Sequence, residues 1–400
     1  MLPVDRFLLH CSLIDGVGPA TVQPLLDNLR QNGEGAVEAL YHCSMKDFVY
    51  QYHIQARSAA LLASGLEDMT KLEGECIALE REHIAWISIL DPRYPDYLRN
   101  THLPPIGLYV QGNAELLCKQ CLVACVGSRD LNEYGEIAAR RIVGELVTLG
   151  AIVVSGGARG IDTIVHRTVL QAKGQTIAIL GSGLCEPYPA QNKNLFESIC
   201  AHGGALVSPF PLYMRAIPGN FPARNRIIAG ISHATLVIQA ALQSGALITA
   251  AYALEAGREV GAVPGRIDDP LAAGCHQLFT QGALVVTSGK SVLQALGHDI
   301  ALYRQKEIIP TRDQLLIVDR VEKNIKKEIP AKSIAIDTGT IDTGNLIYIC
   351  KQPRLFDELY TVGTWSSESA LREELWKLCI QGEIEQNFMG QWCSIIKKPL

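Results

Sequence analysis

The sequence predicts an α/β protein organised around a doubly wound parallel sheet. An apolar run at residues 122–126 stops at Gly127-Ser128-Arg129, and a helical repeat of apolar residues follows it. A second apolar run at residues 151–154 stops at Ser155-Gly156-Gly157 and leads into another helical pattern. The same alternation continues through predicted strands at residues 176–180, 205–208, 235–239, 259–263 and 283–286. Short β-rich runs alternating with helical patterns are typical of parallel strands joined by covering helices.

Residues 1–85 show helical patterns, and the turn Gly16-Val17-Gly18-Pro19 separates two apolar stretches. A G-x-G turn followed by proline at the first helical position resembles a helix-hairpin-helix, whose backbone amides can hold a DNA phosphate. An ordinary helix connection is the alternative. The segment has 6 Lys and Arg against 12 Asp and Glu, and this acidic balance favours the ordinary connection. The connector at residues 91–113 is rich in proline and tyrosine and is expected to run extended against a neighbouring domain.

The loops after the predicted strands are rich in glycine and include two arginines, Arg129 and Arg159. In open parallel sheets, ligands bind at the carboxyl ends of the strands, where helix N-termini offer free N–H groups to anions. No G-x-G-x-x-G motif follows the first strand, so no dinucleotide cofactor is expected. The loops therefore predict a site for a phosphate-bearing ligand.

The last hundred residues divide into a linker at residues 298–344, with mixed charge and few aromatic residues, and a small domain at residues 345–400. Ser367 is placed to cap a helix, and residues 388–392 resemble a hairpin turn. The inner face of that helix would carry Leu371, Leu375 and Leu378. A helix followed by a hairpin indicates a winged helix. Because the helix is slightly acidic, the domain is expected to contact protein rather than DNA.

Composition and charge limit the possible classes of protein. The chain has 400 residues, 48% hydrophobic and 19% charged, as in soluble proteins with two or three domains. No uncharged apolar run could span a bilayer and no signal peptide is evident, so we expect a cytoplasmic protein without a membrane partner. Among 12 cysteines only Cys118 and Cys121 form a C-x-x-C pair, so buried thiols and no metal are expected. The net charge is −5, but residues 86–297 have 16 Lys and Arg against 14 Asp and Glu, which places an anionic partner there.

The stretch at residues 218–228 adds a second group of cations. Phe221 lies between prolines in what is expected to be an irregular loop, and Arg224 and Arg226 follow just before an apolar helix. Guanidinium groups pair with phosphate oxygens, and an exposed aromatic ring beside them offers a face to a nucleobase. The alternative is a structural network of arginine ion pairs around a buried phenylalanine.

Five ordered motifs together resemble the DprA/Smf family of bacterial DNA-processing proteins. They are Gly127-Ser128-Arg129, SGGARGID, GSGLCEPYP with Asn192, FPARNRIIAG, and QSGALITAAYALEAGREVGAVPG. The resemblance as a whole runs from about residue 91 to residue 289. The resemblance implies an extended Rossmann-like domain at residues 86–297, flanked by an N-terminal SAM-like helical domain and a C-terminal winged-helix-like domain. It also implies binding of single-stranded DNA without sequence preference, loading of RecA in natural transformation, homodimerisation through the Rossmann-like domain, and no catalytic activity.

The resemblance assigns DNA binding to residues that match the motifs one by one. These are Ser128, Arg129, Gly157, Arg159, Gly160, Lys193, Phe221, Arg224, Asn225, Arg226, Ser244, Gly245 and Thr249. Pro209 and Gln239 depart from the pattern, because the family usually has glutamates there. Both changes remove negative charge near the strand ends, which puts ion pairs between those glutamates and the arginines in doubt. His166 matches the family's histidine in the helix after GID and is expected to pack or form hydrogen bonds rather than act as a base.

An enzyme is the main alternative, because nucleotide phosphoribohydrolases resemble this fold in their loops. Their chemistry needs a carboxylate that steadies an oxocarbenium-like transition state. Asp162 and Glu255 are the candidates, but the strand-end position at residue 239 is a neutral glutamine. A nucleotide-sensing scaffold is a third possibility, which would share the site and differ in the size of its ligand.

Overall fold

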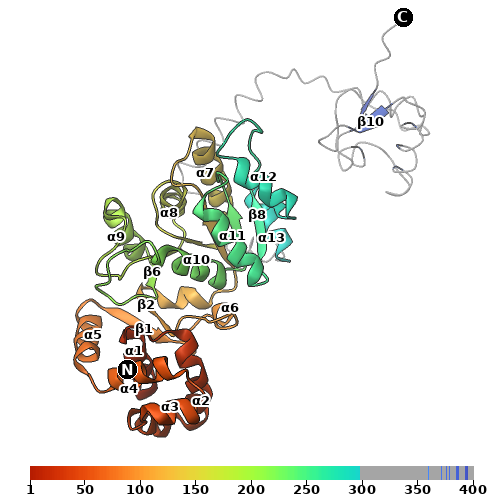
Figure 1. Cartoon of the computed structure of the whole chain (residues 1–400). Helices are drawn as coiled ribbons and strands as arrows, with labels where there is room; N and C mark the ends of the chain where they lie inside the picture. Colours follow the sequence, from red (N-terminus) through yellow and green to blue (C-terminus); the bar gives the residue numbers. More distant parts are fainter. Residues whose placement is uncertain are drawn as a thin grey trace, which may run out of the picture. The chain divides into compact units, whose positions relative to one another are not determined.

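The computed structural model describes residues 1–297 and, in the last hundred residues, Leu359, Leu371, Leu375, Leu378, Ile384–Gln386 and Trp392–Ser394. The chain divides into two compact units, Met1–Ile308 and Ile309–Leu400, and each is described by itself (Figure 1).

Nine strands of the first unit's described residues form one sheet in the order β1-β2-β6-β5-β4-β3-β7-β8-β9. Their bounds are β1 Ile84–Ser88, β2 Gly107–Gly112, β3 Leu122–Val126, β4 Ile152–Ser155, β5 Thr176–Ile179, β6 Ala205–Ser208, β7 Ala234–Val237, β8 Glu259–Ala262 and β9 Leu284–Val285. From β6 to β9 all neighbours are parallel, whereas β1 pairs with β2 and β2 with β6 antiparallel. The doubly wound parallel sheet predicted from the sequence is therefore confirmed, and β3 to β9 are the seven predicted strands.

Helices cover both faces of this sheet. The α-helices are α1 Pro3–Leu13, α2 Pro19–Tyr41, α3 Met45–Tyr50, α4 Ala56–Leu66, α5 Thr70–Arg81, α6 Asp96–Arg99, α7 Glu133–Thr148, α8 Ile161–Gln171, α9 Lys193–Ala201, α10 Asn220–Ile231, α11 Gly245–Glu255, α12 Ala273–Thr280 and α13 Gly289–Ala295. Helices α7, α8, α9 and α13 cover one face, and α10, α11 and α12 cover the other (Figure 1). Among the described residues, no helix is long and apolar enough to cross a bilayer.

The N-terminal helices pack against the antiparallel edge of the sheet. Phe7 and Leu8 of α1 belong to the same buried cluster as Ile87 of β1 and Leu108 of β2. The backbone carbonyl of Asp5 accepts a hydrogen bond from Trp86 Nε1 at 3.2 Å, and its carboxylate accepts one from Ser88 Oγ at 2.6 Å. The connector that was expected to be extended thus contributes β2, and the boundary expected at residue 85 falls inside β1.

The second unit contains the hairpin that the sequence indicates. Strand β10, Ile384–Gln386, pairs antiparallel with β11, Trp392–Ser394. The three leucines of the expected helix are helical and buried: Leu371, Leu375 and Leu378. Ser367 and the linker at residues 298–344 lie outside the described residues.

Candidate nucleic-acid interface

The carboxyl ends of β3, β4 and β5 form a shallow pocket with two exposed arginines at its rim. Because these strands are parallel neighbours, the loops that follow them meet at one edge of the sheet. The pocket, called here the strand-end pocket, is lined by Arg129, Gly156, Ala158, Arg159, Tyr188, Pro189, Phe221 and Arg224. Its enclosed space is about 20 Å³, which is room for about one water molecule. A nucleotide would therefore lie on this surface rather than inside it.

The aromatic part of the strand-end pocket is built around Phe221. Its half-buried ring has the Arg129 guanidinium carbon 5.2 Å from its centroid and the Tyr188 ring at 5.9 Å. The ring also lies over Gly181, where an added Cβ would come within 3.0 Å of it. An arginine beside an accessible aromatic face can hold a phosphate while a base stacks. Tyr188 was not among the predicted site residues, although it stands in the GSGLCEPYP motif that supported the resemblance.

Two glycines allow the loop after β4 to pack closely against its neighbours. Gly160 has φ +80°, and an added Cβ would lie 2.3 Å from the carbonyl oxygen of Ser128. The amide of Ile161 donates a hydrogen bond to that same carbonyl at 3.1 Å. Gly157 has φ +64°, and an added Cβ would lie 2.7 Å from the Phe196 ring. Both predicted glycines therefore permit close packing next to the pocket, and at Gly160 the approach of the two loops brings Arg129 and Arg159 to one rim.

Arg224 lies beneath the pocket rather than on its surface. Its side chain is 4% exposed and donates from Nη1 to the carbonyl oxygens of Gly156 and of Ile179, the latter at 2.9 Å. Asp162 is also buried and accepts hydrogen bonds from the amides of Gly156 at 3.1 Å and Ala158 at 3.3 Å. Burial lowers the pKa of Arg224 to about 10, which the Asp162 charge opposes, and burial raises the pKa of Asp162, which the Arg224 charge opposes. These contacts fit the structural network considered as an alternative, and they hold the loop after β4 in place.

The segment around Phe221, expected to be an irregular loop, is instead the start of α10. The helix begins at Asn220, so Pro222 falls in the first turn, where proline is tolerated because the N–H groups there have no intrahelical acceptor. Successive helical residues are rotated by about 100°, so Arg224 and Arg226 differ by about 200°. The two arginines therefore point to different sides of the helix.

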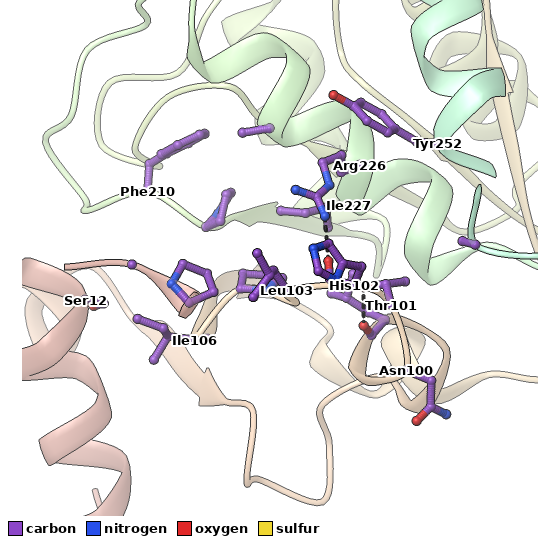
Figure 2. A pocket seen from close by; sticks show the side chains of 18 of the residues that line it. Ser12, Asn100, Thr101, His102, Leu103, Ile106, Phe210, Arg226, Ile227 and Tyr252 are labelled. Carbon is purple, nitrogen blue, oxygen red and sulfur yellow. Dashed lines mark hydrogen bonds between the residues drawn. The ribbon is translucent and has the colours of Figure 1, made fainter. Parts of the chain in front are cut away.

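Arg226 and Asn225 make contacts away from the strand-end pocket. Arg226 donates from Nη2 to the His102 carbonyl at 2.5 Å, and its guanidinium carbon lies 5.7 Å from the Tyr252 ring centroid, in a separate cavity (Figure 2). Asn225 Nδ2 donates to the Gly245 carbonyl at 3.3 Å, which links α10 to the start of α11.

The other expected DNA-binding residues do not line the strand-end pocket. Lys193 is exposed at the first position of α9. Ser128 is buried, and its hydroxyl accepts a hydrogen bond from the Asp130 amide at 3.2 Å. Ser244 caps α11 by accepting from the Ala246 amide at 3.3 Å, next to the exposed Gly245. Thr249 is 1% exposed. Of these residues, only Lys193 and Gly245 are exposed and could meet a ligand on this side of the molecule.

Gln239 has a structural role. Its side-chain Nε2 donates to Asn132 Oδ1 at 2.8 Å, and its Oε1 accepts from the Asn132 amide at 3.3 Å. Asn132 in turn caps α7 by accepting from the Gly135 amide at 3.0 Å. An amide satisfies both roles at once, because it carries a donor and an acceptor. Within the described part of the chain, no three His, Cys, Asp or Glu residues are grouped as a metal site would require.

Comparison with known proteins shows the family of the chain. The family model described as DNA recombination-mediator protein A matches residues 85–297, which contain the whole strand-end pocket. The chain belongs to this family. The matched segment includes β2 to β9 and all but the first residue of the edge strand β1.

Individual relatives cover different shares of the chain. Protein Smf of Escherichia coli is 45% identical over 203 residues, or 51% of this chain and 54% of that protein. The chain thus spans about half the length of this relative. DNA processing protein DprA of Bacillus subtilis is 36% identical over 242 residues, or 60% of this chain and 81% of that protein. The X-ray structure of DNA processing protein A from Streptococcus pneumoniae matches with a TM-score of 0.63 and 32% identity, covering 74% of this chain and 98% of that one.

Proposed function

We propose that this chain binds single-stranded DNA without sequence preference at the strand-end pocket and acts in the cytoplasm as a recombination mediator. The observation that carries the proposal is the Arg129 guanidinium, 5.2 Å from the centroid of the half-buried Phe221 ring and beside the exposed Arg159. Arginines at the rim hold phosphates of any sequence, and a phenylalanine ring stacks any base because every base has a π-face.

The shape of the strand-end pocket favours a single strand over a duplex. The Phe221 ring can be reached only by a base that has left its stack, and bases of a duplex remain stacked. The pocket offers no deep groove into which a rigid duplex could fit, and its enclosed space is about 20 Å³.

Loading of RecA in natural transformation and homodimerisation belong to the same proposal. Their support is the family's description as a DNA recombination-mediator and the resemblance of the motifs. We also propose that residues 345–400 form the winged helix expected from the sequence and contact protein rather than DNA.

The site gives little support to the enzyme alternative. Of the two candidate carboxylates, Asp162 is buried with Arg224 and two amides, and Glu255 lines the separate cavity instead of the strand-end pocket. The Gln239 side chain is hydrogen-bonded to Asn132. We therefore propose a non-catalytic role, and hydrolysis of a nucleotide by the purified chain would contradict it.

Replacement of Phe221 tests the stacking surface. Phe221→Ala should weaken binding of single-stranded DNA by about 1–3 kcal/mol, whereas Phe221→Trp should keep most of the affinity. Because the ring is only half-buried, the alanine variant should lose less stability than the roughly 3–5 kcal/mol typical of a core phenylalanine. Fluorescence anisotropy and thermal melting measure the two quantities. Tyr50→Ala is the matched control, since Tyr50 is an aromatic residue 77% exposed on α3. Unchanged affinity in Phe221→Ala would refute the stacking role.

A further inference from the structure

A second and larger cavity lies between the N-terminal helices and the sheet-covering helices α10 and α11. Its volume is about 430 Å³, within the roughly 300–1,000 Å³ of small-molecule sites. The walls come from the α1–α2 turn at Val17, Gly18 and Pro19, from the loop at residues 100–106, and from α10 and α11. Figure 2 shows Arg226 and Ile227 reaching from α10 toward the loop that carries His102 and Leu103, with Phe210 to one side. The cavity is called here the seam cavity.

The seam cavity is lined by one cation, Arg226, by one carboxylate, Glu255, and by aromatic and aliphatic side chains. Arg226 is half-buried, donates one hydrogen bond to the His102 carbonyl, and forms no ion pair with any residue that the structure describes. Tyr252 lies beside it, with the ring centroid 5.7 Å from the guanidinium carbon, and Phe210 is half-buried in the same lining. A guanidinium held in a partly desolvated site attracts an anion, and aromatic rings beside it offer faces to a flat heterocycle.

The seam cavity is joined to the strand-end pocket by α10. Phe221 lies in the first turn of the helix at the strand-end pocket, and Arg226 lies five residues later at the seam cavity. Five residues correspond to about 7.5 Å along the helix axis. Ala223, which stands between them, is exposed and lines the seam cavity. A strand held at Phe221 could therefore pass over the start of α10 and reach Arg226.

We propose that the seam cavity is a second nucleotide-binding subsite, in which Arg226 holds a phosphate and Tyr252 and Phe210 face its base. This inference rests on the proposed binding of single-stranded DNA and extends it to a second, unstacked nucleotide. It also gives the N-terminal helices a part in binding despite their acidic charge, because the wall that they contribute is uncharged: Ser12, Val17, Gly18 and Pro19. Glu255 lines the opposite wall, where a carboxylate can accept a hydrogen bond from a base N–H group.

Three variants of the full chain test the seam cavity. Arg226→Gln removes the cation, Tyr252→Leu removes the aromatic face, and Ala223→Trp fills the cavity from an exposed helix position while it keeps Arg226. Arg167→Gln and Tyr50→Leu are the matched controls, because both residues are exposed and neither lines the two binding cavities. Thermal melting shows that each variant is folded.

Oligothymidylates of two lengths are the probes: one of roughly 20 nucleotides, which can occupy both subsites, and one of roughly 4 nucleotides, near the lower limit for a single site. Each of the three variants should weaken binding of the long strand by about 5- to 150-fold, the range for loss of one stacked base. Binding of the short strand, which Phe221 and Arg129 should hold, is expected to stay within about twofold.

The outcomes separate this inference from the proposed function. If the wild-type chain binds neither oligonucleotide, the proposed function itself fails. If the wild type binds the long strand and all three variants bind it equally well, the seam cavity is not a subsite although the function stands.

Titration with thymidine monophosphate distinguishes a free nucleotide from a nucleotide of the DNA strand. Binding of the free nucleotide that is lost in Arg226→Gln, with no change for the long strand, would assign the cavity to a free nucleotide instead of the DNA strand.

Discussion

Replacement of Arg224 by alanine should destabilise the protein by about 3–5 kcal/mol, because it leaves the Asp162 carboxylate buried without its counter-charge. Arg224 is 4% exposed and Asp162 is 5% exposed, so in the folded chain both charges are stabilised by protein groups rather than by bulk water. Two backbone carbonyls, those of Gly156 and Ile179, would also lose their donor. Denaturation by urea, followed by circular dichroism, measures this loss in the free energy of unfolding.

Two further variants serve as controls for Arg224→Ala. Arg167→Ala removes an exposed arginine from α8 and should change stability by no more than about 0.5 kcal/mol. The double variant Asp162→Asn with Arg224→Ala should recover part of the loss, since no uncompensated charge remains in it. Wild-type stability in Arg224→Ala, together with lost DNA binding, would show that Arg224 is a surface phosphate contact after all.

Acidification should destabilise the fold through His166. Its side chain is fully buried, its Nδ1 lies 2.8 Å from Thr176 Oγ1, and burial, with a smaller contribution from Arg224, lowers its pKa to about 3. Because the unfolded chain has a histidine pKa of about 6.5, its imidazole takes up a proton first as the pH falls. The stability that the neutral ring provides is complete above pH 6.5 and is lost progressively toward pH 3. The total loss is on the order of 5 kcal/mol, at up to about 1.4 kcal/mol per pH unit.

Comparison with His166→Phe isolates this effect. Phenylalanine has a similar size and cannot be protonated, and the Thr176 hydroxyl keeps its hydrogen bond to the Val153 carbonyl at 2.7 Å. Burial raises the pKa of Asp162, which acts in the opposite sense, but that contribution is common to both proteins. As the pH falls below 6.5, the wild type should therefore lose more free energy of unfolding than the variant does. Parallel pH profiles would contradict the assignment.

The parallel part of the sheet could be predicted because its strands are buried on both faces. Residues 122–126 are a continuous apolar run and residues 205–208 are apolar up to Ser208; both are strands with the expected bounds. The antiparallel strands β1 and β2 were missed. Strand β2, Gly107–Gly112, follows prolines that indicated an extended connector rather than a strand of the sheet, and its partners in β1 lie 19 to 27 positions earlier in the chain.

The motifs of the candidate site could be predicted from the sequence, but the directions in which its side chains point could not. The glycine loops and Phe221 identified the strand-end pocket, because parallel strands place their following loops at one edge. Arg224 and Arg226 have different surroundings because both lie in α10, which begins at Asn220. The sequence alone did not show that the helix begins ahead of both arginines. Given that start, the helical rotation places one arginine in the core and the other in the seam cavity.

Binding of single-stranded and duplex DNA of the same sequence, titrated over a range of salt concentrations, tests the central claim most directly. The accessible cations Arg129, Arg159, Lys193 and Arg226 predict a slope of log affinity on log salt near −3, at roughly −0.7 for each phosphate contact. Arg129→Gln should make the slope shallower by about 0.7 and weaken binding to all sequences alike. We expect clearly tighter binding of the single strand, with this slope. Equal affinity for the duplex, or a slope that Arg129→Gln leaves unchanged, would contradict it.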